Sequence, residues 1–227
     1  MRRLVASCSI AVVAVAVLAA CGGSGSKRPA SSDGKQPGTS EKKGDASGRA
    51  FAKLYADAAN RKFKITFTIG GKDEKTYAQD GNGKSVYAAG DSQTFTSSAG
   101  SVVCTRASGT ATCAPLPGSD TTSPFAGYYT AGKKYIEALG GNVGDESSKT
   151  IAGRAAQCAT ISAQSVARAA GAGVRPIKGS ATYCIDKDTG VLLEIGSTDA
   201  SGDESTAFAV TKFEQPTDSE LTPPATP

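Results

Sequence analysis

The stretch FKITFTI at Phe63–Ile69 decides the fold, because four large apolar residues alternate strictly with Lys and Thr. Successive side chains of a β-strand point to opposite faces, so this period of two is typical of a strand with one buried and one solvated face. We therefore expect a strand over Lys62–Gly70, and the pair Gly70-Gly71 is expected to end it.

Weaker strand patterns occur further along the chain, and turn signals such as Asp80-Gly81-Asn82-Gly83 separate them. The other expected strands are Thr76–Gln79, Ser85–Ala89, Gln93–Ser97, Ser101–Thr105, Thr110–Ala114, Gly179–Asp186, Gly190–Ser197 and Thr206–Phe213, of which Ser101–Thr105 and Thr110–Ala114 are expected to form a hairpin. The segment Thr150–Ile161 is assigned no type, and the Ala-rich segment Ser162–Gly173 is compatible with a short helix or a loop.

Two segments have the periodicity of a helix. Near the expected start of the folded region at Gly48, four apolar residues follow the spacing i, i+3, i+4, i+7: Phe51, Leu54, Tyr55 and Ala58. A second helix is predicted to begin at Ser123-Pro124 and to end at Gly140-Gly141. Its apolar stripe consists of Phe125, Tyr128, Tyr129, Ile136 and Leu139.

The order of these elements is helix, strands, helix, strands, without the βαβ alternation of parallel sheets. We therefore predict an α+β fold. Its core would be a curved antiparallel β-sheet, or half-barrel, whose apolar side is concave and covered by the helices.

Four cysteines lie in the expected folded region: Cys104, Cys113, Cys158 and Cys184. If Ser108-Gly109 is a two-residue turn, Cys104 and Cys113 face each other as a non-hydrogen-bonded pair about 4.5 Å apart, which suits a disulfide. The bond Cys158–Cys184 then follows by elimination. A zinc site of four thiolates is the alternative, but the CxxC-type pairs usual for such a site do not occur.

The first 20 residues have the features of a secretory signal: Arg2 and Arg3, an apolar run that contains Cys8, and small residues at the end. Because Leu18-Ala19-Ala20 is followed by Cys21, the segment resembles a bacterial lipoprotein signal. The resemblance implies cleavage before Cys21, a diacylglyceryl thioether on its sulfur, and acylation of the new amino group, for example with palmitate. An ordinary signal peptide with a chance cysteine is the alternative.

Residues 21–47 are expected to form the lipidated cysteine and a flexible tether. From Gly22 to Ser47 there is no aromatic residue and no Leu, Ile or Val, so little apolar area is available to offset the entropy of ordering. The expected location is the extracytoplasmic face of the cell membrane, with attachment through the lipid. Residues 48–227 would form the folded domain.

The chain resembles the LolA/LppX-like lipoproteins and their actinobacterial relatives over about residues 48–224. The matching features are Leu18–Cys21, the helix that leads into Phe63–Ile69, the central helix ending near Leu139, Ile151–Arg154, Tyr183–Leu193 and Leu221–Pro224. The resemblance implies an eleven-strand-type half-barrel with helices over an apolar cavity, and the handling of a lipid or lipoprotein. The chain differs from many members in its two disulfides and its few large aliphatic residues.

Residues and motifs typical of catalytic and metal sites are scarce. The sequence contains no His, the commonest general base and metal ligand, and no G-x-S-x-G motif. The pair Ser40 and Lys43 has S-x-x-K spacing but lies in the expected tether. Asp186–Gly190 resembles the start of a calcium loop without its later ligands, so a hairpin turn is the preferred interpretation.

We therefore predict no enzyme activity, no catalytic residue, no metal site and no cofactor, with an unrecognised carboxylate hydrolase as an alternative. The formal charge of +4 becomes +2 once Arg2 and Arg3 are removed, which predicts no nucleic-acid partner.

The functional prediction is a membrane-anchored carrier or binder of a hydrophobic ligand, such as a lipid or lipoprotein. The candidate pocket residues are Ile65, Phe67, Tyr128, Tyr129, Ile136, Phe208 and Val210. Packing of the helix against the sheet is the simpler interpretation of the two tyrosines. The alternative function is a protein-interaction or sensor module without a lipid cavity.

Overall fold

The computed structural model describes residues 43–107, 109–116, 146–165 and 178–224. The first elements are the helix α1 (Lys43–Asp57) and a 3-10 turn, η1 (Ala58–Asn60). The strands are β1 (Phe63–Ile69), β2 (Lys75–Gln79), β3 (Ser85–Ala89), β4 (Ser92–Ser97), β5 (Gly100–Ala107), β6 (Thr110–Pro115), β7 (Glu146–Ile151), β8 (Arg154–Ser162), β9 (Ser180–Asp186), β10 (Leu192–Thr198) and β11 (Glu204–Glu214).

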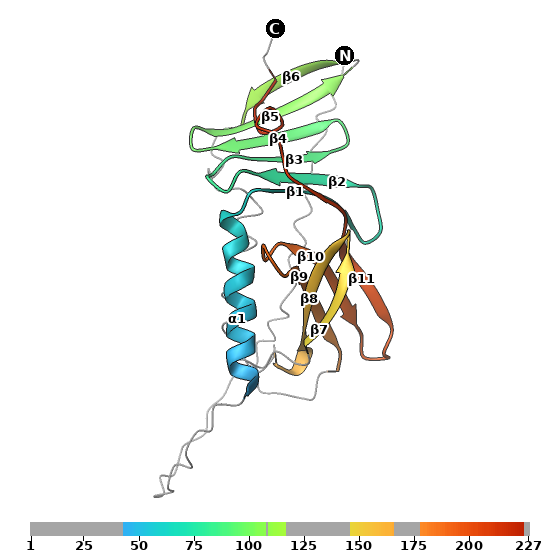
Figure 1. Ribbon diagram of the computed structural model, residues 1–227. Helices are drawn as coiled ribbons and strands as arrows, with labels where there is room; N and C mark the ends of the chain where they lie inside the picture. Colours follow the sequence, from blue (N-terminus) through green and yellow to red (C-terminus); the bar gives the residue numbers. More distant parts are fainter. Residues whose placement is uncertain (1–42, 108, 117–145, 166–177, 225–227) are drawn as a thin grey trace, which may run out of the picture. The chain divides into compact units, whose positions relative to one another are not determined.

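All eleven strands belong to one antiparallel sheet with the order β6-β5-β4-β3-β2-β1-β11-β10-β9-β8-β7 (Figure 1). Two meanders, β1–β6 and β7–β11, are joined where the first strand pairs with the last. The sheet is open, because β6 and β7 are its edges, and it is curved. This confirms the predicted curved antiparallel sheet, although the described part of the chain is mostly β.

The two faces of the sheet are distinguished at β1. Phe63, Ile65 and Phe67 are buried on one side, which we call the inner face, while Lys64 and Thr66 point to the opposite side, the outer face. Neighbouring residues in a register row share a face. The alternation predicted from FKITFTI is therefore correct, except at Ile69, which is 42% exposed because β1 ends there at the Gly70-Gly71 turn.

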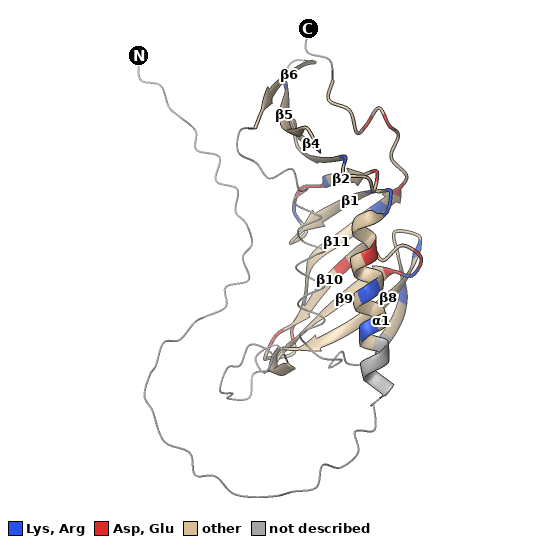
Figure 2. Ribbon diagram, turned by 90° about the vertical axis from the view of Figure 1, so that its left-hand side faces the viewer, with Lys and Arg blue, Asp and Glu red and all other residues tan. Residues whose placement is uncertain are grey.

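Helix α1 packs its predicted apolar face into the same core as the inner face. Phe51, Tyr55 and Ala58 are buried in one cluster with the inner-face residues of β1. The helix begins at Lys43, earlier than the expected start near Gly48, because each residue added to an existing helix gains a hydrogen bond at low cost. In Figure 2, basic and acidic residues occur along α1 while most of the sheet is uncharged.

Gln79 fixes the end of this helix to the sheet. Its register partner in β1 is Phe63, so it belongs to the inner face. Its side-chain Nε2 donates to the carbonyl oxygens of Ala58, Ala59 and Arg61 at 3.1, 2.9 and 2.7 Å. Because Gln79 is buried, these bonds satisfy an amide that would otherwise be costly to remove from water.

The turn between β9 and β10 touches the C-terminal part of α1. Gly190 has a φ of +74°, and a Cβ atom at this position would lie 1.8 Å from the carbonyl oxygen of Leu54. No side chain therefore fits between the turn and the helix. The turn itself is held by Asp186, whose carboxylate accepts hydrogen bonds from the backbone N–H groups of Asp188 and Thr189 at 3.1 and 2.8 Å.

The structure joins Cys104 to Cys113 and Cys158 to Cys184, the two pairings expected from the sequence. Cys104 lies opposite Cys113 in the β5–β6 register, in which Ala107 also pairs with Thr110. The Cα atoms are 4.0 Å apart in both bonds.

Several predicted elements differ from the structure or lie outside the described residues. The central helix at 123–139 and most of Ser162–Gly173 are outside them. Strand β7 was not predicted, because the side chains of residues 147–150 are exposed and leave no apolar alternation to detect. Among the described residues, no helix is long and apolar enough to cross a membrane.

After β11, residues 215–224 form a segment that we call the strap. It runs across the outer face of the β1–β6 meander (Figure 1). Glu220 accepts a hydrogen bond from Lys64 Nζ at 2.6 Å, and Asp218 accepts one from Lys62 Nζ at 3.2 Å. Leu221 is only 5% exposed. It belongs to a second apolar cluster with Ala78, Val86, Phe95 and Cys104.

Glu220 makes the attachment of the strap dependent on pH. The hydrogen bond from Lys64, then that from the backbone N–H of Thr217, lowers the pKa of Glu220 from 4.5 to about 2. A carboxylate with a lowered pKa stabilises the fold fully above its unfolded value, and this stabilisation is lost as pH falls from 4.5 through about 2.

We expect Glu220→Gln to lower the free energy of unfolding by at most about 1 kcal/mol near pH 7, since the ion pair is exposed. This difference from the native chain should shrink steadily as pH falls below 4.5. Urea unfolding of both chains over this range measures it. A difference that stays constant with pH would show that the charge of Glu220 contributes nothing.

Candidate functional site

Four of the seven candidate pocket residues come together at the centre of the sheet. Ile65 and Phe67 lie on β1, and Phe208 and Val210 lie on the adjacent β11. Phe67 is the register partner of Val210, and its ring centroid is 4.9 Å from that of Phe208. All four are at most 7% exposed. They therefore form one continuous apolar row on the inner face.

The other three candidates, Tyr128, Tyr129 and Ile136, lie outside the described residues. Their relation to the apolar row stays a prediction.

Three aromatic residues extend the row but were not among the predicted pocket residues: Phe63, Tyr77 and Phe213. The ring of Phe63 lies 5.8 Å from that of Tyr77 and 6.4 Å from that of Phe213. A β-bulge explains the omission of Phe213. The register shifts between Thr66 and Phe67, so Phe213 pairs with Ile65 and faces inward although its spacing from Val210 is odd. Only the pairing of β1 with β11 reveals this.

One register row of the inner face becomes polar beyond β1. It continues from Gln79 on β2 through Ser85 and Thr96 to Ser101 on β5, and all four residues are buried. The hydroxyls of Thr96 and Ser101 lie 3.2 Å apart and share a hydrogen bond. The inner face thus joins the apolar row, which Tyr77 extends onto β2, to one row of hydroxyl and amide groups that crosses β2–β5.

One basic side chain lies at the border of the apolar row. The guanidinium of Arg154 lies 5.0 Å from the centroid of the Phe213 ring, which favours a cation–π contact. It also donates to Asp186 at 2.7 Å and to Asp188 at 3.0 Å. Burial opposes ionisation of Asp186, but hydrogen bonds from Arg154 and Thr189 outweigh it, so the pKa of this carboxyl lies below its usual value.

The hydrogen bonds of Asp186 distinguish a hairpin turn from a calcium loop at Asp186–Gly190. The Asp186 carboxylate accepts the turn's own N–H groups as well as the guanidinium of Arg154, so its lone pairs are already used. The expected hairpin turn is confirmed, and the charge of Arg154 is compensated beside the apolar row.

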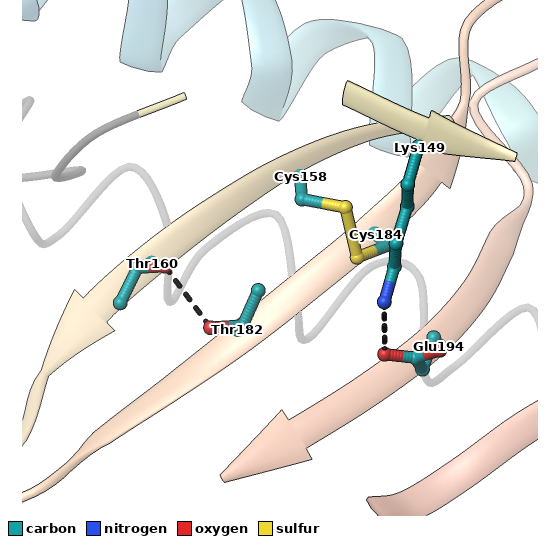
Figure 3. The surroundings of a disulfide bond; sticks show 6 residues. All are labelled: Lys149, Cys158, Thr160, Thr182, Cys184 and Glu194. Atoms are coloured by element: carbon teal, nitrogen blue, oxygen red, sulfur yellow. Dashed lines mark hydrogen bonds and ion pairs between the residues drawn. A yellow bond between two sulfur atoms is a disulfide. The ribbon is translucent and has the colours of Figure 1, made fainter. Parts of the chain in front are cut away.

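The outer face of the other meander is polar around its disulfide. Figure 3 shows Lys149 reaching past Cys158–Cys184 to Glu194, with which it forms an ion pair. The hydroxyls of Thr160 and Thr182 bond across β8 and β9 at 3.0 Å. The surroundings of this disulfide are therefore polar, in contrast to the apolar row on the inner face.

Comparison with known proteins adds similarities of fold. No protein-family profile matches the chain, and no curated protein is significantly similar to it. Similar solved structures include MucB of Pseudomonas aeruginosa in complex with MucA, at 16% identity and a TM-score of 0.42, over 78% of this chain and 61% of that one. This chain thus spans about three fifths of that MucB chain.

Two mycobacterial proteins are also similar. LprF from Mycobacterium bovis has 12% identity and a TM-score of 0.40, over 76% of this chain and 95% of that one. The lipoprotein LppX of Mycobacterium tuberculosis has 14% identity and a TM-score of 0.35, over 76% and 98%. LppX belongs to the group that the sequence resembles, and the comparison of structures also identifies it as similar. Identities and scores this low carry no argument about function.

Proposed function

We propose that the domain binds a hydrophobic ligand, such as a lipid or an acylated protein, on its inner face, and that helices cover this face on its concave side. The observation that carries the proposal is the continuous apolar row of Ile65, Phe67, Phe208 and Val210. A binder of this kind gains about 25 cal/mol for each Å² of apolar surface that it buries.

The polar part of the inner face supports a ligand with two unlike ends. The acyl chain would lie along β1 and β11, while a head group that accepts and donates hydrogen bonds would lie toward Thr96 and Ser101. Ligand sites of this type are mostly apolar, with a few polar groups that fix the orientation.

A matched pair of variants tests this proposal. Phe67 and Phe95 are both buried phenylalanines, but Phe67 belongs to the inner face and Phe95 to the cluster under the strap. We expect Phe67→Leu to weaken binding of a fluorescent fatty acid by about tenfold, since a contact worth roughly 1.4 kcal/mol corresponds to this factor. Phe95→Leu should leave this binding unchanged.

Urea unfolding of both variants provides the control, because each substitution removes a similar volume from a buried site. A fatty acid whose affinity is the same in both variants would place the ligand elsewhere. Lipid extraction of the purified full chain supplies an independent measurement of what it carries.

We also propose that residues 1–20 are a cleaved signal, that Cys21 carries a lipid, and that the residues between Cys21 and the start of α1 at Lys43 tether the folded domain to the extracytoplasmic face of the cell membrane. The sequence Leu18-Ala19-Ala20-Cys21 supports this proposal. We expect Cys21→Ser to abolish incorporation of radiolabelled palmitate and to release the protein from the membrane fraction. Retention of the label in this variant would refute the anchor.

A further inference from the structure

The strap covers an apolar row on the outer face, opposite the proposed ligand site. The row crosses neighbouring strands in register, from Ala78 on β2 through Val86 and Phe95 to Val102 on β5. Lys64 on β1 is the register partner of Ala78 and therefore stands at one end of the row. The row and its lysine together present a surface suited to an acidic segment with one large apolar side chain.

The strap has this chemistry. Asp218 and Glu220 meet Lys62 and Lys64, and Leu221 enters the apolar cluster next to them. At its far end, the carbonyl oxygen of Pro224 lies 4.0 Å from Cys113 Sγ. The occupant of the surface is thus a short stretch with two carboxylates followed by a leucine.

The strap is attached almost entirely through side chains. Within the described residues, its backbone hydrogen bonds are local, from Glu220 to Thr217, from Leu221 to Asp218 and from Thr222 to Ser219. It folds as a turn on the sheet and adds no strand to it. The ion pairs are exposed, so water and salt weaken them. Such an element can leave the surface without breaking the sheet.

We propose that the outer face of β1–β5 is a docking site for an acidic, leucine-bearing turn of a partner protein, and that the strap occupies this site until the partner displaces it. Charge complementarity with Lys62 and Lys64 and the fit of Leu221 define the partner's chemistry. This site is separate from the inner face and does not depend on the proposed ligand.

The test uses a fluorescent peptide of residues 214–227 as the probe and measures its binding by anisotropy. The strap is covalently linked to β11, so its effective concentration at this surface is in the millimolar range. If the free peptide binds with a Kd of about 0.1 mM, the strap should weaken its apparent affinity for the full chain about tenfold. We therefore expect a chain ending at Gln215 to bind the peptide about ten times more tightly than the full chain.

Two variants keep the test decisive if the shortened chain does not fold. Leu221→Ser in the full chain should loosen the strap and raise affinity for the native peptide. Lys64→Glu, added to this variant, should weaken binding of that peptide about fivefold or more, since an exposed ion pair contributes up to about 1 kcal/mol, and a peptide carrying Glu220→Lys should recover the affinity. Rescue by the exchanged charge would not occur if Lys64 acted only on stability.

Equal affinity for the full chain and the Leu221→Ser chain would overturn the proposal, as would the absence of any binding. Sedimentation of the full chain distinguishes a further possibility. A dimer that dissociates when the strap is removed would mean that the surface receives the strap of a second copy and not a partner protein.

Discussion

Gly190→Ala is expected to lower the free energy of unfolding by about 3 kcal/mol or more. Two costs add at this position. A φ of +74° is unfavourable for an L-residue by about 1–2 kcal/mol. The new Cβ would also lie 1.8 Å from the carbonyl oxygen of Leu54, so helix α1 must move, and forcing an extra group into a packed site costs about 1–3 kcal/mol. Urea unfolding measures the loss.

Gly70→Ala is the matched control for this prediction. Gly70 also has a positive φ, +58°, but nothing lies within 4 Å of the position that its Cβ would take. In this control, the free energy of unfolding should therefore fall only by the cost of the backbone conformation, about 1–2 kcal/mol. Equal losses in the two variants would mean that α1 does not rest on the turn between β9 and β10.

The second large effect is expected from loss of the disulfide Cys158–Cys184. The bond closes 26 residues, for which the loop-closure relation gives about 3.5 kcal/mol. Both sulfur-bearing residues are almost completely buried, at 1% and 0% exposed, so replacing them by Ala also removes packing. The double variant should thus lose about 3–5 kcal/mol, measured as the shift in the urea midpoint at constant slope.

The disulfide Cys104–Cys113 serves for comparison. It closes only 9 residues at the edge hairpin, which corresponds to about 2.6 kcal/mol. Cys113 is also only partly buried. Replacing this pair by Ala should therefore be the milder change. A larger loss at the edge pair would show that the hairpin β5–β6, and not the meander β7–β11, limits stability.

Local patterns predicted most of the sheet. The alternation of FKITFTI identified β1 and its buried side, and the turn signals near Asp80 and Gly90 identified β2–β4. The turn expected at Ser108-Gly109 was enough to align Cys104 with Cys113, which are register partners in the structure. These features depend on neighbours in the sequence, which is the information that periodicity and turn chemistry contain.

Features that depend on distant pairing could not be predicted in this way. The inward direction of Phe213 results from a bulge opposite β1, and a strict period of two would have placed Lys212 inside. The row of Gln79, Ser85, Thr96 and Ser101 appears only when four strands are in register.

The strap was also missed. Leu221-Thr222-Pro223-Pro224 predicts an extended end, but the cluster that buries Leu221 comes from residues more than 100 positions away. Among the candidate site residues, four lie together on the inner face, because each pair alternates within its own strand and the two strands are adjacent.

The pairing of β1 with β11 has a consequence for biogenesis. These strands lie near opposite ends of the folded region, so the contacts of the central ladder are highly non-local and we expect them to form late. If the chain is exported as proposed, the β1–β6 meander reaches the far side of the membrane with its β1 edge unpaired. Completion of the sheet must then wait until nearly the whole polypeptide has been translocated.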